Sequence, residues 1–160
     1  MESSHLAAGT TFSRYAIVRV IGEGGMGAVY EATHLQLKRR VALKLLLPGG
    51  VRNAEARARF FREGELAARL DHPHIVSVLD LGIEGDVPFL VMECLDGEDL
   101  STLLTREGPL PVHTLVEILL PVCAAVAHAH ADGIVHRDLK PANIFLSRTR
   151  SGEVVPKLLD

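Results

Sequence analysis

The sequence has few cysteines and little net charge. Only Cys94 and Cys123 occur among its 160 residues, which excludes a disulfide-rich scaffold and fits a reducing compartment. The formal net charge of −3 at pH 7 gives no overall positive field of the kind that draws proteins to nucleic acid. We therefore expect a cytoplasmic protein with no nucleic-acid partner.

Long apolar runs and a signal peptide are also lacking. No segment reaches the roughly 18 consecutive apolar residues needed to cross a bilayer, and residues 1–13 lack the basic start and apolar stretch of a signal peptide. We expect no membrane segment in this chain, so that any anchor of a parent protein would lie beyond residue 160. With 48% hydrophobic and 23% charged residues, the chain can form the core of a globular domain.

Strand patterns come first along the chain and helix patterns follow. Runs of apolar and β-branched residues predict five strands and one intervening helix, at 15–21, 28–33, 41–47, 53–70 (the helix), 75–83 and 88–94. After a polar joint, helices are expected over 100–106 and 112–131, with a kink at Pro121. This order predicts the α+β class, with an antiparallel sheet followed by the first part of a helical region.

Residues 22–29 read Gly-Glu-Gly-Gly-Met-Gly-Ala-Val and fit the pattern G-x-G-x-x-G-x-V. The backbone amides of such a loop can lie over phosphate groups without obstruction by side chains. A dinucleotide-binding fold would need a helix after this loop, and a strand is expected instead. A P-loop is excluded because Gly-Lys-Ser and Gly-Lys-Thr are absent from the sequence. Taken alone, the pattern fits a flexible hairpin tip equally well.

A lysine, Lys44, lies near the end of the apolar run 41–47. A charge in such a strand is costly unless an acid pairs with it or a phosphate receives it. The alternative is a side chain that reaches solvent at the edge of the sheet. Glu63 and Glu65, both on the predicted helix, are candidate partners that composition alone does not distinguish.

Residues 136–143, His-Arg-Asp-Leu-Lys-Pro-Ala-Asn, match H-R-D-L-x-x-x-N at every specified position. With the glycine loop and Lys44 preceding them in order, the chain resembles the protein kinase superfamily. The segment 138–143 resembles the serine/threonine-specific form, and the segments 24–27 and 72–76 are similar to bacterial eukaryotic-like kinases. The resemblance implies a two-lobed fold, with a tail at 1–14, an ATP-binding N-lobe at 15–94, and a hinge and partial C-lobe at 95–160.

The resemblance also implies ATP and Mg²⁺ as cofactors, with Mn²⁺ as an alternative metal, and a protein substrate with serine or threonine. Asp138 would accept the hydroxyl proton, Lys140 would stabilise the γ-phosphate, and Asn143 would bind the metal. Lys44 would hold the α- and β-phosphates, paired with Glu63 because of the spacing to the His72-Pro73 turn. The other expected nucleotide contacts are Ile21, Gly22, Glu23, Gly24, Gly25, Met26, Gly27, Val29, Ala42, Met92, Glu93, Leu95 and Phe145.

In the family that the chain resembles, Asp160 would be a second metal ligand and would be followed by Phe-Gly. Here Asp160 is the last residue, so we expect a kinase fragment that is inactive by itself. The competing interpretation is a non-catalytic module that binds nucleotide or another kinase. The sequence gives no indication of the oligomeric state.

Overall fold

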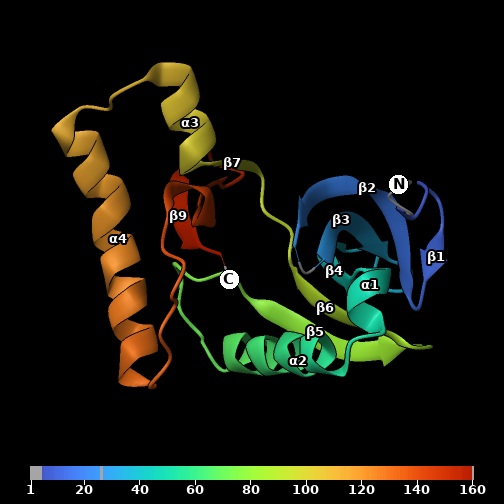
Figure 1. Cartoon of the computed structure of the whole chain (residues 1–160). Coiled ribbons are helices and arrows are strands. Elements are labelled where there is room, and N and C mark those ends of the chain that lie inside the picture. The colour runs from blue at the N-terminus through green and yellow to red at the C-terminus, as the bar shows by residue number, and fades with distance from the viewer. Residues whose placement is uncertain (1–4, 26, 160) are drawn as a thin grey trace. The chain divides into compact units, whose positions relative to one another are not determined.

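The computed structural model describes residues 5–25 and 27–159 (Figure 1). Met26 and Asp160, both expected site residues, lie outside the described residues. The chain forms two compact units, and each is described by itself. The first unit comprises Met1–Ala68 and Val78–Cys94, and the second comprises Arg69–Ser77 and Leu95–Asp160.

The described part of the first unit contains a six-stranded antiparallel sheet in the order β1-β2-β3-β4-β6-β5. The strands are β1 (Thr11–Phe12), β2 (Tyr15–Gly24), β3 (Gly27–His34), β4 (Arg40–Leu46), β5 (Val78–Glu84) and β6 (Val87–Glu93). Five of them correspond to expected strands. The additional strand, β1, has two residues, too few to show a periodic pattern. Strand β5 begins later than the strand expected at 75–83, because Ile75 instead forms a bridge with Leu158 in the second unit.

One face of this sheet carries the core of the first unit. Cross-strand pairing joins Tyr30 to Leu43 and Leu43 to Val91, and these side chains are 2%, 0% and 1% exposed. Their buried neighbours on the same face are Tyr15, Ile17, Ala28, Ala32, Val41, Leu45 and Phe89. Each large apolar side chain buried in this way stabilises the fold by about 1.5–3 kcal/mol. We call this side of the sheet the core face.

Helix α2 (Ala54–Ala68) packs on strands β5 and β6. Its first turn is capped by Asn53, whose Oδ1 accepts hydrogen bonds from the backbone N–H of Glu55 at 2.9 Å and of Ala56 at 3.1 Å. A Cβ on the buried Gly64 would lie 3.0 Å from Leu81 Cδ1. Glycine therefore lets the helix approach the sheet closely, which explains a helix-weakening residue at mid-helix. A short helix, α1 (Pro48–Val51), precedes α2 where no helix was expected.

The second unit contains helices α3 (Leu100–Glu107) and α4 (Val112–Ala131), both close to their expected bounds. The described residues also contain the short 3₁₀ helix η1 (Pro141–Asn143) and a three-stranded sheet in the order β7-β8-β9. Its strands, β7 (Gly97–Asp99), β8 (Ile144–Arg148) and β9 (Val154–Leu158), were not predicted, because segments of three to five residues carry little periodicity. The core of this unit joins Leu100, Ile118, Val122, Ile144, Leu146 and Leu158.

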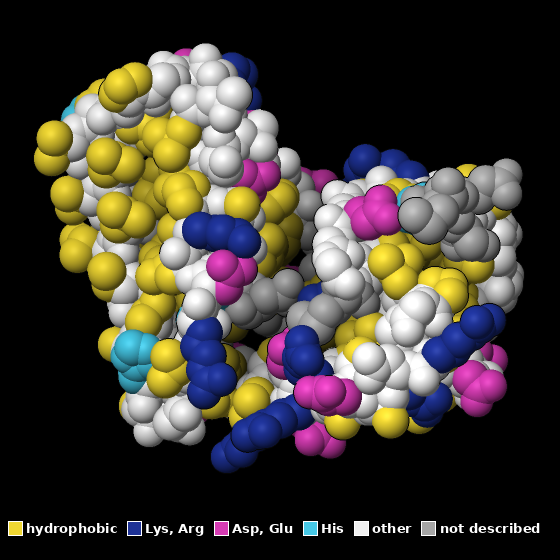
Figure 2. Space-filling view, in the orientation of Figure 1, with side chains coloured by type: hydrophobic (Ala, Val, Ile, Leu, Met, Phe, Trp, Pro, Cys, Tyr) yellow, Lys and Arg dark blue, Asp and Glu magenta, His cyan; other side chains and the backbone are white. Residues whose placement is uncertain are grey.

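Helix α4 continues through Pro121 and exposes an apolar stripe. Its members, Val112, Val116, Leu119 and Leu120, are 40–77% exposed, and Figure 2 shows hydrophobic side chains gathered over this helix. By length and composition α4 could cross a membrane, with a mean hydropathy of 1.7 over an 18-residue window of which 22% is buried. Core helices can pass the same test of length and composition, so the expectation that this chain has no membrane segment stays a prediction.

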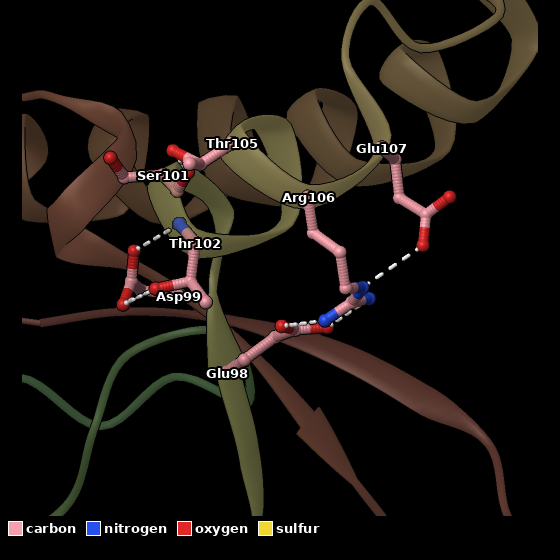
Figure 3. Close-up of polar contacts among 7 residues, drawn as sticks. All are labelled: Glu98, Asp99, Ser101, Thr102, Thr105, Arg106 and Glu107. Atoms are coloured by element: carbon pink, nitrogen blue, oxygen red, sulfur yellow. Dashed lines mark hydrogen bonds and ion pairs between the residues drawn. The ribbon is translucent and has the colours of Figure 1, made fainter.

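A polar network fixes the start of α3 (Figure 3). Asp99 Oδ1 accepts a hydrogen bond from the Thr102 N–H at 2.9 Å, and Asp99 Oδ2 accepts one from the Thr102 hydroxyl at 2.8 Å. One turn on, the Arg106 guanidinium binds the carboxylates of Glu98 and Glu107. Asp99 therefore acts as the N-cap of α3.

We expect Asp99→Ala to lower the free energy of unfolding by about 1 kcal/mol, because the helix loses its cap. Urea denaturation followed by circular dichroism measures the difference. Glu107→Gln is the control, because an exposed ion pair contributes at most about 1 kcal/mol and often nothing measurable. Equal midpoints for the two variants would contradict the capping role of Asp99.

Candidate active site

The glycine-rich loop is the tip of the β2–β3 hairpin. Gly24 pairs with Gly27 across the tip, so a strand follows the loop, as expected, and not the helix of a dinucleotide-binding fold. A Cβ on Gly27 would lie 2.4 Å from the Leu45 carbonyl oxygen, whereas a Cβ on Gly24 or Gly25 would meet nothing within 4 Å. Gly27 is thus required by the packing of the strands, while open space surrounds the other two glycines, as a phosphate-covering loop needs.

The sheet register brings several expected nucleotide contacts onto one face. Val29 pairs with Lys44, and Ala42 pairs with Met92. Lys44 and Ala42 are two residues apart on β4, so all four side chains lie on the side opposite the core face. Gly22, the cross-strand neighbour of Val29, belongs to the same side. We call this side the nucleotide face.

Helix α2 covers part of the nucleotide face near Lys44. The Lys44 side chain is half-buried, and its cross-strand neighbour is Leu90. A Cβ on Gly64 would lie 3.3 Å from Leu90 Cδ1, so the helix residue next to Glu63 packs beside the strand neighbour of Lys44. Glu63 and Glu65 are both exposed on α2. The pairing of Lys44 with Glu63 stays a prediction, supported by the packing of these elements.

Three other expected nucleotide contacts in the first unit, Ile21, Glu23 and Glu93, lie at separate positions on the sheet. Ile21 is 42% exposed near the end of β2, and Glu93 ends β6, paired with Val41. Glu23 pairs with Ala28, which puts its side chain on the core face. Only the backbone of Glu23, and not its carboxylate, can therefore serve the nucleotide face.

Two expected contacts belong to the second unit. Phe145 lies between Ile144 and Leu146 on β8, and those two neighbours are buried in the core of the unit. Because side chains alternate along a strand, Phe145 points to the opposite side, where its ring lies 3.4 Å from a Cβ built on Gly97. Leu95, half-buried, lies outside any helix or strand. Their contact with adenine stays a prediction.

The catalytic-loop residues expected from the sequence lie together in the second unit. Asp138 Oδ2 lies 2.9 Å from Lys140 Nζ. Asn143 Nδ2 donates to Asp138 Oδ2 at 3.1 Å and to the Asp138 backbone carbonyl at 2.8 Å. A lysine and an amide thus contact one exposed carboxylate, which is an arrangement suited to holding a hydroxyl and a phosphate.

The same contacts control the protonation of Asp138. The hydrogen bond from the Lys140 ammonium is the main cause that lowers the pKa of Asp138 below its usual value, and the hydrogen bond from Asn143 acts in the same direction. Asp138 is therefore a carboxylate at neutral pH. In that state it can accept a hydrogen bond from a hydroxyl and orient the hydroxyl oxygen.

A role for His136 was not recognised from the sequence, although the residue belongs to the matched motif. The Asp138 backbone N–H donates to His136 Nδ1 at 3.2 Å, so Nε2 carries the proton that is donated to the Leu159 carbonyl at 2.8 Å. Leu159 N–H in turn donates to the Asn143 carbonyl at 2.8 Å. Between His136 and Asp138, Arg137 adopts a left-handed backbone conformation with φ of 66°. His136 therefore fixes the catalytic loop to the residue that precedes Asp160.

The expected metal ligands were Asn143 and Asp160. Asn143 directs its Nδ2 to Asp138, which leaves Oδ1 as the amide atom of the oxygen type that Mg²⁺ prefers. Asp160 lies outside the described residues. Within the part of the chain that the structure describes, no group of three or more histidine, cysteine, aspartate or glutamate side chains could hold a metal ion.

Known proteins share this fold and these motifs. The mycobacterial PknI kinase domain (Mycobacterium tuberculosis) superposes with a TM-score of 0.82 at 39% identity, covering 98% of this chain and 62% of that one. The apo form of PpkA-294 gives a TM-score of 0.85 at 29% identity, covering 99% of this chain and 62% of that one. The kinase-like fold expected from the sequence is confirmed.

Sequence relatives point to the same family. The serine/threonine-protein kinase PrkC of Bacillus subtilis is 46% identical over 133 residues, covering 83% of this chain and 20% of PrkC. The serine/threonine-protein kinase pkn3 of Myxococcus xanthus is 42% identical over 148 residues, covering 92% and 27%. The chain thus spans about a fifth to a quarter of these relatives. The family model for the protein kinase domain matches residues 15–160, and this chain belongs to the protein kinase domain family.

Proposed function

We propose that this chain is the ATP-binding and catalytic-loop part of a protein serine/threonine kinase. The observation that carries the proposal is the Asp138 carboxylate, held by Lys140 at 2.9 Å and by Asn143 at 3.1 Å. The names of PrkC and pkn3 support serine and threonine as the accepting residues. The reaction would transfer the γ-phosphoryl group of ATP to a side-chain hydroxyl, with ADP as the leaving group.

Each residue has a role that follows from its position. Asp138 orients the hydroxyl and takes its proton as the oxygen–phosphorus bond forms, while Lys140 offsets negative charge on the transferred group. On the nucleotide face, Lys44 holds the α- and β-phosphates, and the backbone of the glycine-rich loop covers them. Val29 and Ala42 supply apolar surface for adenine.

The residues fit a magnesium nucleotide. Open space beside Gly24 and Gly25 leaves room for phosphates, and the oxygen of Asn143 and the carboxylate of Asp160 are hard ligands of the type that Mg²⁺ prefers. Bound Mg²⁺, or Mn²⁺ in its place, would neutralise charge on the phosphate oxygens. We further propose that the kinase domain works in the cytoplasm, where ATP is available.

The test uses the native gene product, incubated with Mg²⁺, γ-labelled ATP and a generic basic protein. We expect label on serine and threonine, lost when EDTA removes the metal and restored by added Mg²⁺ or Mn²⁺. Phosphoamino-acid analysis identifies the accepting residue. Label on tyrosine alone would contradict the proposed specificity.

A second measurement separates the two candidate functions. Isothermal titration calorimetry of the same protein with ATP and Mg²⁺ reports binding without chemistry. Binding with no label on any protein, the protein itself included, would favour the non-catalytic nucleotide-binding module. Absence of both binding and label would overturn the proposal for the nucleotide face as well.

A further inference from the structure

Residues 5–12, which we call the N-terminal segment, are packed on the first unit. Leu6 packs against the core. The Gly9 N–H donates to the Ile17 carbonyl at 2.8 Å, and the Ile17 N–H donates to the Thr10 carbonyl at 2.8 Å. Residues 9–12 of this segment, expected from the sequence to be part of a tail, are therefore attached to strand β2.

The beginning of the segment reaches the glycine-rich hairpin through Tyr30. The Leu6 N–H donates to the Tyr30 hydroxyl oxygen at 3.3 Å, and that hydroxyl lies 3.4 Å from His5 Nδ1. The other ring nitrogen, His5 Nε2, lies 3.5 Å from Glu23 Oε2. In a neutral imidazole one ring nitrogen accepts a hydrogen bond and the other donates one. When His5 Nδ1 accepts the hydrogen bond of the Tyr30 hydroxyl, Nε2 carries the ring proton and directs it to Glu23, so His5 need not be charged to join the two residues.

Tyr30 makes this chain of contacts rigid. Its side chain is 2% exposed within the core face, and the His5 ring packs edge-to-face on it, with centroids 6.4 Å apart. Glu23 lies on the same face, since it pairs with Ala28. The next residue, Gly24, begins the tip of the hairpin. His5 therefore connects a fixed core residue to the residue that precedes the flexible glycines.

We propose that the N-terminal segment positions the glycine-rich loop for nucleotide binding, with His5 as the positioning residue. The contact holds the hairpin from the core face, so the nucleotide face stays clear for ATP. This inference rests on the proposed function of the loop. None of the residues 5–12 needs to touch ATP for the effect.

The energetic reason is conformational freedom. Glycines at 24 and 25 give the hairpin tip many accessible backbone conformations. A nucleotide that binds only one of them binds more weakly in proportion to the fraction of molecules in that conformation. Holding Glu23 raises that fraction. The effect falls on the dissociation constant and KM for ATP, while kcat stays unchanged because the Asp138 loop belongs to the other unit.

The experiment compares His5→Ala, His5→Gln and the control His113→Ala, an exposed histidine on α4, in the native gene product. Hydrogen exchange reports the amides of Gly24, Gly25 and Gly27, and calorimetry gives the dissociation constant for ATP with Mg²⁺. We expect His5→Ala to speed exchange at these amides and to weaken ATP binding, each about two- to fivefold, the range of one partly exposed polar contact. His5→Gln should retain most of the native behaviour, because its amide can still donate to Glu23.

A double-variant cycle tests the contact itself. In the variant that combines His5→Ala with Glu23→Ala, the second change should add little to the first. Unchanged exchange at the three glycines in His5→Ala would overturn the proposal, and so would equal acceleration at the core amides of Leu43 and Val91, because His5 would then act on the whole fold. If no variant binds ATP, the proposed function of the loop fails, while the exchange result still decides whether His5 holds the hairpin.

Discussion

Asp138→Asn is expected to lower the rate of phosphoryl transfer by about 10²- to 10⁴-fold, the usual contribution of a positioned general base. The asparagine keeps the shape of the side chain but removes the charge that the Lys140 ammonium contacts at 2.9 Å. It can orient a hydroxyl only weakly and cannot take its proton. The rate is measured with labelled ATP under saturating nucleotide, so that the change reports on kcat.

Asp132→Asn is the matched control, with the same loss of charge at the exposed C-cap of α4. We expect its rate to stay within about twofold of the native rate. The dissociation constant for ATP should be similar in the control and in Asp138→Asn, because the proposed contacts to adenine and to the α- and β-phosphates through Val29, Ala42 and Lys44 belong to the first unit. A rate for Asp138→Asn within tenfold of the native rate would show that another residue takes the proton.

Gly97→Ala is expected to produce the largest loss of stability. Gly97 has φ of 138°, a conformation that residues with a side chain rarely adopt, and a Cβ there would lie 2.0 Å from the Leu146 carbonyl oxygen. Because Gly97 pairs with Ser147 across β7 and β8, the clash is with the backbone of a strand that supports the core. The strands must separate, which we expect to cost more than about 3 kcal/mol.

Urea denaturation of the chain measures this loss, and Gly152→Ala provides the comparison. Gly152 also has a positive φ, of 87°, but a Cβ there meets nothing within 4 Å. Its substitution should cost only the backbone strain of about 1–2 kcal/mol. A loss for Gly97→Ala no greater than that for Gly152→Ala would mean that β7 and β8 adjust without separating.

Much of the fold could be predicted from the sequence because its signals are local. The longer strands and helices α2, α3 and α4 show in the periodicity of apolar residues, and Asn53 and Gly108 mark helix ends. The three short strands of the second unit could not be found in this way. They exist because β8 and β9 pair across a turn and β7 joins them from a distant part of the chain, and such long-range pairing leaves no local pattern.

The candidate site divides in the same way. Motif matching found Asp138, Lys140 and Asn143, and the structure brings them together. Motif matching could not show that the Glu23 carboxylate lies on the core face, because this depends on the register of the β2–β3 hairpin and on two register shifts in β2. The contribution of His136 was hidden for a related reason, since its partner Leu159 lies 23 residues away in the sequence.

Gly24 and Gly27 occupy fixed positions of the motif and Gly25 a variable one, yet the structure groups position 25 with 24 and separates both from 27. At position 27 the constraint comes from the carbonyl of Leu45, so a side chain there interferes with the protein's own backbone. At positions 24 and 25 the polypeptide imposes no such limit, and any restriction must come from what binds. A natural variant with a side chain at 27 therefore raises a question about folding, whereas one at 24 or 25 raises a question about which ligand that protein accepts.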